Sequence, residues 1–491
     1  MKSNPRLTPG SDRLSGYLWQ MLVRLRAASR RRHPGFAARE RELNALGVAI
    51  ASSPGPHPRR RPVVVAGRLL AGAGRRRASR SLPAGRPRSV LMVVQRYGPE
   101  VAGGAEALCR QLAVRLAGRG LDVHVLTSCA TDAETWANAY PEGSSTVDGV
   151  TVHRLAVRKP RDPVAFGSLC QSVLPRGAEP GPELQKEWLE AQGPDLPDLV
   201  PWLEGRVDSF DLAMHFSYLY STTWGALPVT SGRIPTVLHA TAHDEAAFWL
   251  PAYDPVFRMP SAFAWLTAEE RDLVLRRGGR ARGMVVGAGF DLAGGGRGEA
   301  FRRHLGLGDS RYLLFVGRAE DGKGARELTD FFQEYKARHP GPLQLVFVGP
   351  AAERVDHPAI HYAGFVEERL RGDAMAGCLA LVQPSYFESF SMVLVEAWSE
   401  GRPVLVQGLS DVLAGQARRS GGGVSFRGYA EFEAAVELLE RHPRVAGHMG
   451  RAGRRFSERN FGWDVVLDRY EGLMAVATAT PVRPVSTTPR G

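Results

Sequence analysis

Two glutamates that flank a predicted helix start are the residues of this 491-residue chain best placed to contact a bound ligand. Glu388 and Glu396 lie in the segment 387–397, with seven residues between them. An apolar run over 379–384 precedes the pair and helix-forming residues follow it, so the segment crosses from a strand end into a helix. Eight positions on one helix would set the carboxylates about 80° apart, so both face a common ligand only if Glu388 precedes the helix.

The expected chemistry is binding of a nucleotide at the start of this helix. The first backbone N–H groups of a helix are free and lie at the positive end of its dipole, so they suit a phosphate. Open α/β sheets bind ligands at the carboxyl ends of their strands. Glu179 and Glu187 have the same spacing in an ordinary polar segment, so the interpretation depends on the strand and helix around the pair.

A glycine-bearing loop earlier in the same half carries two cations. It follows the predicted strand 312–316 and contains Arg318 and Lys323, which could both contact one diphosphate. A solvated surface pair is the alternative. The chain has 5 lysines against 58 arginines, and this bias draws attention to Lys323.

The N-terminal half begins with a βαβ pattern. Apolar strands over 90–94 and 121–126 flank a predicted helix that starts near Gly103 and Gly104. The turn lacks the G-x-G-x-x-G fingerprint, and no acidic residue suited to a ribose follows the second strand, which argues against a dinucleotide site. Gly104 either lets a ligand approach the helix N-terminus or forms a plain tight turn.

One histidine of this half occupies a position typical of functional residues. His243 follows the predicted strand 235–238, in the run 239–245. An alanine follows His239, so the run is not the H-E-x-x-H motif of a zinc protease. Its place at the carboxyl end of a strand makes His243 a candidate, and a hydrogen-bonded structural histidine is the alternative.

Short apolar strands alternate with helices in both halves, which predicts an α/β fold of two doubly wound, Rossmann-like domains. With 44% hydrophobic residues the chain can bury two cores. Residues 158–206 are rich in proline and predict an insertion of short helices. The remaining strands are expected at 212–215, 345–348, 360–362, 379–382 and 404–406.

Positive charge is concentrated at the N-terminus. Residues 1–90 carry 20 Lys and Arg against 3 Asp and Glu, and the rest of the chain carries 43 against 48. Apolar residues at helical spacing predict an amphipathic helix over 11–32 that could lie on an anionic membrane. A disordered extension or a misassigned start codon is the alternative. Because the folded part has no excess of positive charge, we expect no nucleic-acid partner.

Cysteine usage and hydropathy bear on the compartment. The four cysteines are scattered and form no C-x-x-C pair, which is typical of a reducing compartment. No stretch approaches the roughly 18 apolar residues of a spanning helix. We therefore expect a cytoplasmic protein, with contact to the inner face of the membrane as an open possibility.

Four motifs of the C-terminal half occur in a definite order and spacing. They are Gly317-Arg318 with Lys323-Gly324, then 363–366, then Glu388 with Glu396-Ala397, then 401–404. Together they resemble the donor half of the retaining glycosyltransferases of family 4, which have the GT-B fold. The segments 103–106, 243–245 and 286–291 are similar to the N-terminal half and interdomain turn of the same family. The resemblance covers residues 89–475.

The resemblance implies two domains that face each other across a cleft. The expected organisation is a basic extension over 1–88, an N-terminal acceptor domain over 89–288, a C-terminal donor domain over 289–462, a helix over 463–477 that crosses back to the first domain, and a flexible tail over 478–491.

The resemblance also implies how a nucleotide-sugar donor is held. Arg318 and Lys323 would bind the diphosphate, and Glu396 would accept hydrogen bonds from the ribose hydroxyls. The backbone of Phe365 and Val366 would pack beside the base.

The remaining implied roles lie near the reacting sugar. Glu388 would contact the sugar ring and His243 would sit near the anomeric carbon, so these are the expected catalytic residues. Gly104 would leave room for phosphate or acceptor, and Ser391 and Met392 would complete the donor site at the helix start. Ser391 replaces the usual glycine of the family, which bears on how closely the backbone approaches the phosphate.

The function implied is retaining transfer of a hexose from a nucleoside-diphosphate sugar to a glycan or lipid-linked acceptor. Retention in this family is explained by attack on the face from which the leaving group departs, while cations stabilise the departing phosphate. The chain has no Asp-x-Asp, so we expect no metal and no other cofactor. Alternatives are a noncatalytic nucleotide-sugar or glycan-binding protein, a sugar-nucleotide epimerase and a glycan phosphorylase. The donor base, the sugar and the acceptor stay open.

Overall fold

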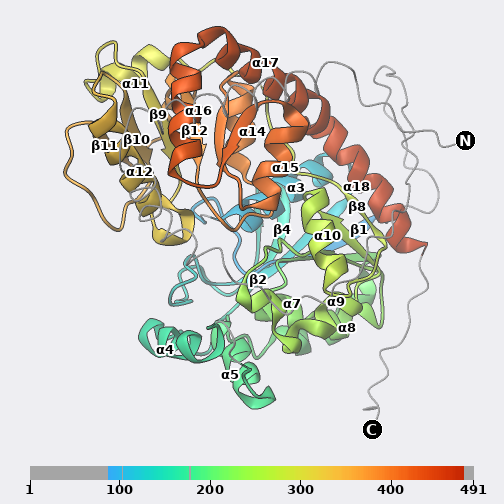
Figure 1. The fold of residues 1–491 in the computed structure, drawn as a ribbon. Coiled ribbons are helices and arrows are strands. Elements are labelled where there is room, and N and C mark those ends of the chain that lie inside the picture. Colours follow the sequence, from blue (N-terminus) through green and yellow to red (C-terminus); the bar gives the residue numbers. More distant parts are fainter. Residues whose placement is uncertain (1–86, 102, 176–178, 293, 480–491) are drawn as a thin grey trace, which may run out of the picture.

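The computed structural model describes residues 87–101, 103–175, 179–292 and 294–479. They form two α/β domains, each built around its own sheet, and Figure 1 shows the second domain (yellow to red) above the first (blue to green). The predicted helix over 11–32 lies outside the described residues, as does nearly all of the basic extension. No helix in the described part is long and apolar enough to cross a bilayer.

The first sheet has eight strands in the order β3-β4-β2-β1-β5-β6-β7-β8. All pair in parallel except the edge strand β3, which runs antiparallel to β4. The central strands are buried, as a sheet covered by helices on both faces requires. The strands are β1 Ser89–Val93, β2 Asp122–Ser128, β3 Gly143–Val147, β4 Val150–Leu155, β5 Leu212–Phe216, β6 Thr236–His239, β7 Ala262–Trp265 and β8 Gly283–Val285.

The helices of the first domain include the predicted insertion of short helices. Two of these, α4 and α5, pack against each other at the edge of the molecule (Figure 1). The helices are α3 Gly104–Gly118, α4 Pro163–Val173, α5 Pro182–Gln192, α6 Leu199–Glu204, α7 Ser221–Trp224, α8 Leu227–Ser231, α9 Asp254–Arg258 and α10 Ala268–Arg276, with short 3-10 turns η1 Val207–Ser209, η2 Ala246–Trp249 and η3 Pro251–Tyr253.

The second sheet has six strands, all parallel, in the order β11-β10-β9-β12-β13-β14. Its strands are β9 Tyr312–Val316, β10 Gln344–Val348, β11 Ile360–Gly364, β12 Ala380–Gln383, β13 Val404–Gln407 and β14 Gly423–Phe426. The helices that cover it are α11 Gly298–His304, α12 Ala325–Arg338, α13 Glu368–Gly377, α14 Met392–Ser399, α15 Asp411–Ser420, α16 Tyr429–Arg441 and α17 Pro443–Asn460, with the 3-10 turn η4 Asp321–Lys323.

The last helix joins the two domains. Helix α18, Trp463–Thr478, follows the second sheet in sequence but packs against β6, β7 and β8 of the first. Its buried face includes Val466, Tyr470 and Leu473. One continuous apolar core therefore reaches from the first sheet through α18 into the second domain.

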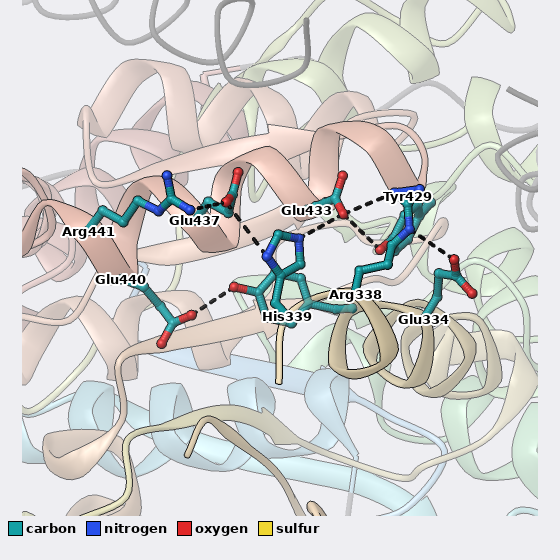
Figure 2. Close-up of polar contacts among 9 residues, drawn as sticks. Glu334, Arg338, His339, Tyr429, Glu433, Glu437, Glu440 and Arg441 are labelled. Carbon is teal, nitrogen blue, oxygen red and sulfur yellow. Dashed lines mark hydrogen bonds and ion pairs between the residues drawn. The ribbon is translucent and has the colours of Figure 1, made fainter. Parts of the chain in front are cut away.

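A polar network fixes α12 against α16 on the second domain, and Figure 2 shows its side chains between the two helices. The buried carboxylate of Glu433 pairs with Arg338 at 3.3 Å and with His339 at 3.0 Å, and it accepts a hydrogen bond from the Tyr429 hydroxyl at 3.1 Å. Helix α12 begins at Ala325, two residues after Lys323. The network joins the C-terminal end of α12, the end away from Lys323, to α16.

We expect Glu433→Ala to lower the free energy of unfolding by about 1 to 3 kcal/mol, because it removes a fully buried acceptor that Arg338, His339 and Tyr429 share, although Arg338 keeps its pair with Glu334. Urea unfolding followed by circular dichroism measures the change. The matched control is Glu458→Ala, which breaks the half-exposed pair with Arg454 and should change the same quantity by less than about 1 kcal/mol. Equal effects of the two substitutions would contradict a structural role for the network.

Candidate active site between the two domains

The carboxyl edges of the two sheets face each other across a small pocket of about 110 Å³. The loop after β6 brings His243 to it, and the loop after β12 brings Glu388. Strands of parallel sheets present the residues that follow them at one edge, so residues far apart in sequence meet there. The lining also includes Asp244, Glu270 and Phe387.

Lys323 and Glu388 form the center of the site on the second domain. Lys323 Nζ lies 2.9 Å from Glu388 Oε1, which also accepts a hydrogen bond from Gln383 Nε2 at 3.0 Å. Gly324 permits this approach: its φ is 72°, and a Cβ there would lie 2.5 Å from the carbonyl oxygen of Pro384. The two loops pack so closely that only glycine fits between them.

His243 is the matching group on the first domain. Its Nδ1 forms an ion pair with Glu245 Oε1 at 3.0 Å, and the same oxygen accepts a hydrogen bond from the Tyr218 hydroxyl at 3.0 Å. Burial alone would lower the pKa of His243, but the charges of Glu245 and Glu388 outweigh it and raise the pKa above its ordinary value. The second domain thus contributes to the protonation state of a residue on the first.

Helix α14 begins as the sequence predicts, with Glu388 in the preceding loop and Glu396 inside the helix. Ser391 caps it with φ at 69°, a left-handed conformation that favours glycine. Ser391 therefore occupies a backbone conformation that a glycine would adopt at lower cost. Its hydroxyl lies 3.3 Å from Gln383 Nε2, and Met392 is the first residue of the helix.

The other two residues with side chains predicted to bind the donor, Arg318 and Glu396, each pair with a different neighbour. Arg318 is exposed and pairs with Glu320 at 3.3 Å, whereas Lys323 pairs with Glu388. Glu396 is one-fifth exposed and pairs with Arg371 of α13 at 3.3 Å. Burial raises the pKa of Glu396, although the charge of Arg371 opposes this.

Three further predicted residues lie at the ends of strands or helices. The Phe365 side chain is 89% exposed, and Val366 packs against the core. Gly104 is the first residue of α3, and no atom lies within 4 Å of the place where its Cβ would be. The described residues leave this side of Gly104 open, and its role in making room for phosphate or acceptor stays a prediction.

Residues of α10 and its cap that link the domains were not predicted from the sequence. Thr267 Oγ1 donates a hydrogen bond to the carbonyl oxygen of Ser389 at 3.1 Å, and Glu269 forms an ion pair with Arg419 of α15. Thr267 also caps α10 by accepting from the Glu270 N–H. A threonine three positions before a glutamate at a helix start is a capping pattern, and it was a signal in the sequence.

Glu270 supports the loop that carries His243. Its fully buried carboxylate accepts hydrogen bonds from the backbone N–H of Ala242 at 2.9 Å and of Leu266 at 2.6 Å. Thr241, in the same loop, has φ at 48°, a conformation that requires such support. Burial raises the pKa of Glu270 to about 7.

We expect the pH dependence of stability to change in Glu270→Gln. The folded-state pKa of Glu270 lies above its unfolded value, so the folded protein binds the extra proton and loses stability as pH rises from about 4.5 to 7. Across this window the wild-type free energy of unfolding should fall by about 3 kcal/mol relative to the variant. Urea unfolding of both proteins at pH 5 and pH 8 tests this, and a constant difference would contradict it.

Comparisons with known proteins identify the architecture. Residues 310–439 match the family model described as Glycosyl transferases group 1. The glycogen synthase of Mycobacterium tuberculosis is 25% identical over 409 residues, covering 77% of this chain and 92% of that protein. A D-inositol 3-phosphate glycosyltransferase of Gordonia bronchialis is 28% identical over 404 residues, covering 75% and 82%.

Solved structures share the arrangement of both domains. Sucrose-phosphate synthase from Thermosynechococcus elongatus has a TM-score of 0.60 at 17% identity and covers 80% of this chain and 100% of that one. Anabaena Alr3699/HepE in complex with UDP-glucose has a TM-score of 0.57 at 16% identity, covering 78% and 99%. The chain is a GT-B glycosyltransferase.

In this glycosyltransferase the family match runs from just before β9 into α16. It contains Arg318, Lys323, Glu388 and Glu396, on which the resemblance was based. His243 and Gly104 lie outside the matched segment and belong to the first sheet.

Proposed function

We propose that the chain is a retaining, metal-independent glycosyltransferase that moves a hexose from a nucleoside-diphosphate sugar to a glycan or lipid-linked acceptor. The observation that carries the proposal is the pairing across the pocket: Lys323 with Glu388 on one domain faces His243 with Glu245 on the other. A cation beside a helix N-terminus suits a diphosphate, and a histidine suits the hydroxyls of a sugar.

Lys323 would hold the donor diphosphate. An ammonium group has three N–H donors, and its contact with Glu388 uses one of them. The others would bind phosphate oxygens, together with the free backbone N–H groups at the start of α14. These charges would stabilise the phosphate as it leaves, which is the role that a metal ion plays in other transferases.

Glu388 and His243 would act at the sugar. Oε1 of Glu388 is used by Lys323 and Gln383, and Oε2 has no partner among the described residues, so it is free to accept from a sugar hydroxyl. Protonated His243 would donate to another oxygen near the anomeric carbon. No side chain is assigned as nucleophile; the acceptor attacks from the face that the phosphate leaves, and the phosphate takes its proton. Arg318 and Glu396 would bind the diphosphate and the ribose.

The reaction is assigned to the cytoplasm. All four cysteines, Cys109, Cys129, Cys170 and Cys378, are free thiols in the structure, and three of them are buried. Free cysteines are typical of a reducing compartment. Contact with the inner face of the membrane through residues 11–32 is part of the same proposal.

The test is calorimetric binding of UDP-, GDP-, ADP- and dTDP-sugars to the purified full-length chain, in buffer with EDTA. UDP-glucose is the first donor to try, since the Anabaena HepE structure holds it. We expect one sugar nucleotide to bind without metal. Binding of none by a folded sample would contradict the transferase proposal and favour a noncatalytic protein, and binding only after added Mg²⁺ or Mn²⁺ would contradict metal independence.

A further inference from the structure

The first turn of α12 carries a buried acid that the proposed reaction does not use. Glu327 is 3% exposed and follows Lys323 by four residues. Its carboxylate forms no ion pair within the described part of the chain, and both of its oxygens accept from one group, the Tyr386 hydroxyl, at 3.0 and 2.9 Å. Removing a carboxylate from water without a cation is costly, and one hydroxyl offsets only part of that cost. Such a position is typical of a functional site.

The hydrogen bond between the two side chains has a defined direction. Burial raises the pKa of Glu327 to about 7, although the hydrogen bond from Tyr386 opposes the shift. Burial, and after it the charge of Glu327, raises the pKa of Tyr386 far above its ordinary value. The phenol therefore keeps its proton near neutral pH and donates it to Glu327. When the carboxylate is ionised the bond is charge-assisted, which is one of the stronger kinds of hydrogen bond.

Tyr386 connects this acid to the loop that follows β12. Tyr386, Phe387 and Glu388 are consecutive, and all three line the pocket between the domains. The centroid of the Phe387 ring lies 6.4 Å from that of the His243 ring on the first domain. Glu388 pairs with Lys323 at 2.9 Å. A displacement of Tyr386 would therefore move an aromatic contact with one domain and a carboxylate of the other.

Two side-chain contacts join the start of α12 to this loop, and they differ in how a donor would affect them. Lys323 pairs with Glu388 in the pocket, where a bound diphosphate would compete for the ammonium group. Glu327 pairs with Tyr386 in the interior, where both side chains are less than one-tenth exposed. A diphosphate would not compete for this second contact. It would still hold the loop when Lys323 turns to phosphate.

We propose that Glu327 is a positioning residue, which acts through Tyr386 to hold the loop 384–388 so that Glu388 faces the donor sugar. The inference rests on the proposed transferase function, because the contact between Glu388 and the sugar belongs to that proposal. Glu327 itself touches no substrate. Its loss should weaken recognition of the sugar and leave recognition of the nucleoside diphosphate nearly unchanged.

The test compares three variants with a matched control, all in the full-length chain. Tyr386→Phe removes the donor, and Glu327→Leu removes the acceptor. Glu327→Gln keeps one oxygen that accepts from the hydroxyl, so it should behave as wild type. The control is Tyr335→Phe, because Tyr335 lies toward the other end of α12 and donates to Glu440 at 2.7 Å. It removes a hydrogen bond of the same kind at a place that no residue of the pocket contacts.

The first measurement needs no ligand. Proton NMR follows the ring of His243, whose resonances are assigned by comparison with His243→Ala. The Phe387 ring lies beside this imidazole, and the charge of Glu388 contributes to its raised pKa. In the two disrupting variants the resonances should therefore shift and the titration midpoint should fall. Glu327→Gln and Tyr335→Phe should match the wild type.

The second measurement is calorimetric binding of UDP-glucose and of UDP. We expect Tyr386→Phe and Glu327→Leu to bind UDP-glucose about tenfold more weakly than the wild type, and UDP with an affinity that changes by less than about twofold. Equal weakening of both ligands would overturn the assignment to the sugar.

The resonances decide whether the loop is held as proposed. Unchanged His243 resonances in Tyr386→Phe would overturn the inference, and so would the same changes in Tyr335→Phe. Tyr386→Phe keeps the shape of the side chain, so it carries the test if Glu327→Leu does not fold. Failure of the wild type to bind either ligand would contradict the proposed function with this donor, whereas the resonances report the position of the loop without any ligand.

Discussion

Lys323→Ala is expected to weaken binding of the nucleotide-sugar donor by about ten- to hundredfold. A charge-assisted contact between an ammonium and a phosphate contributes about 1.5 to 3 kcal/mol, and the substitution also leaves Glu388 without its cation at 2.9 Å. The negative charge of Glu388 would then face the diphosphate directly. Isothermal calorimetry with the donor found by the nucleotide screen measures the loss.

The matched control for this substitution is Lys336→Ala. Lys336 lies on α12 of the same domain, where its ammonium donates to the carbonyl oxygen of Gly341. Its removal should leave donor affinity unchanged. Arg318→Ala should weaken the donor less than Lys323→Ala, because the Arg318 side chain is 70% exposed and water screens its charge. Unchanged donor affinity in Lys323→Ala, with the fold intact by circular dichroism, would sink the diphosphate assignment.

His243→Ala is expected to lower turnover by about a hundred- to a thousandfold, the usual effect of removing one preorganised donor from a transferring group. Donor affinity should change little, because Lys323 and the start of α14 would still hold the diphosphate. Steady-state kinetics with saturating donor measures turnover, and calorimetry measures donor affinity. His448→Ala, on the exposed face of α17, is the control and should behave as wild type.

The protonation of His243 gives a second readout of the same role. Although burial opposes it, the charge of Glu245 raises the pKa of His243, so the imidazolium persists to a higher pH than an ordinary histidine. Turnover should therefore fall as pH rises through this pKa. In Glu245→Gln the pKa should drop, and turnover should fall at lower pH. Proton NMR of the His243 ring follows the titration directly, and an identical midpoint in both proteins would contradict the coupling.

The donor half could be predicted closely from the sequence because its signals are local. Strands such as 312–316 are buried apolar runs, and the structure gives β9 these same bounds. Glu388 in a loop and Glu396 in a helix follow from chain order, and the structure confirms both. The local sequence thus determined these elements, the parallel sheet and the place of the candidate pocket at its carboxyl edge.

Elements without a strong apolar pattern were missed. Strand β3 is almost wholly exposed, with the sequence Gly-Ser-Ser-Thr-Val, and it pairs antiparallel at the sheet edge. Strands β4, β7, β8 and β14 were missed as well; β4 alternates buried and half-buried residues, β8 is only partly buried and β14 has an exposed residue, so these three are not continuous buried runs. Their stability comes from neighbours in the sheet, which a local pattern does not contain.

Residue types and local order within the sequence determined that Lys323, Glu388 and His243 would follow strands and that Glu396 would lie in the next helix. Only the tertiary structure decided their partners: Lys323 with Glu388, His243 with Glu245, and Glu270 beneath the loop of His243. Only the tertiary structure showed the cavity of about 740 Å³ that residues of α4 and α5 line. The physical reason is that pairing energies and pKa shifts depend on distance and burial, and α18 and the strand order bring together residues that the chain keeps far apart.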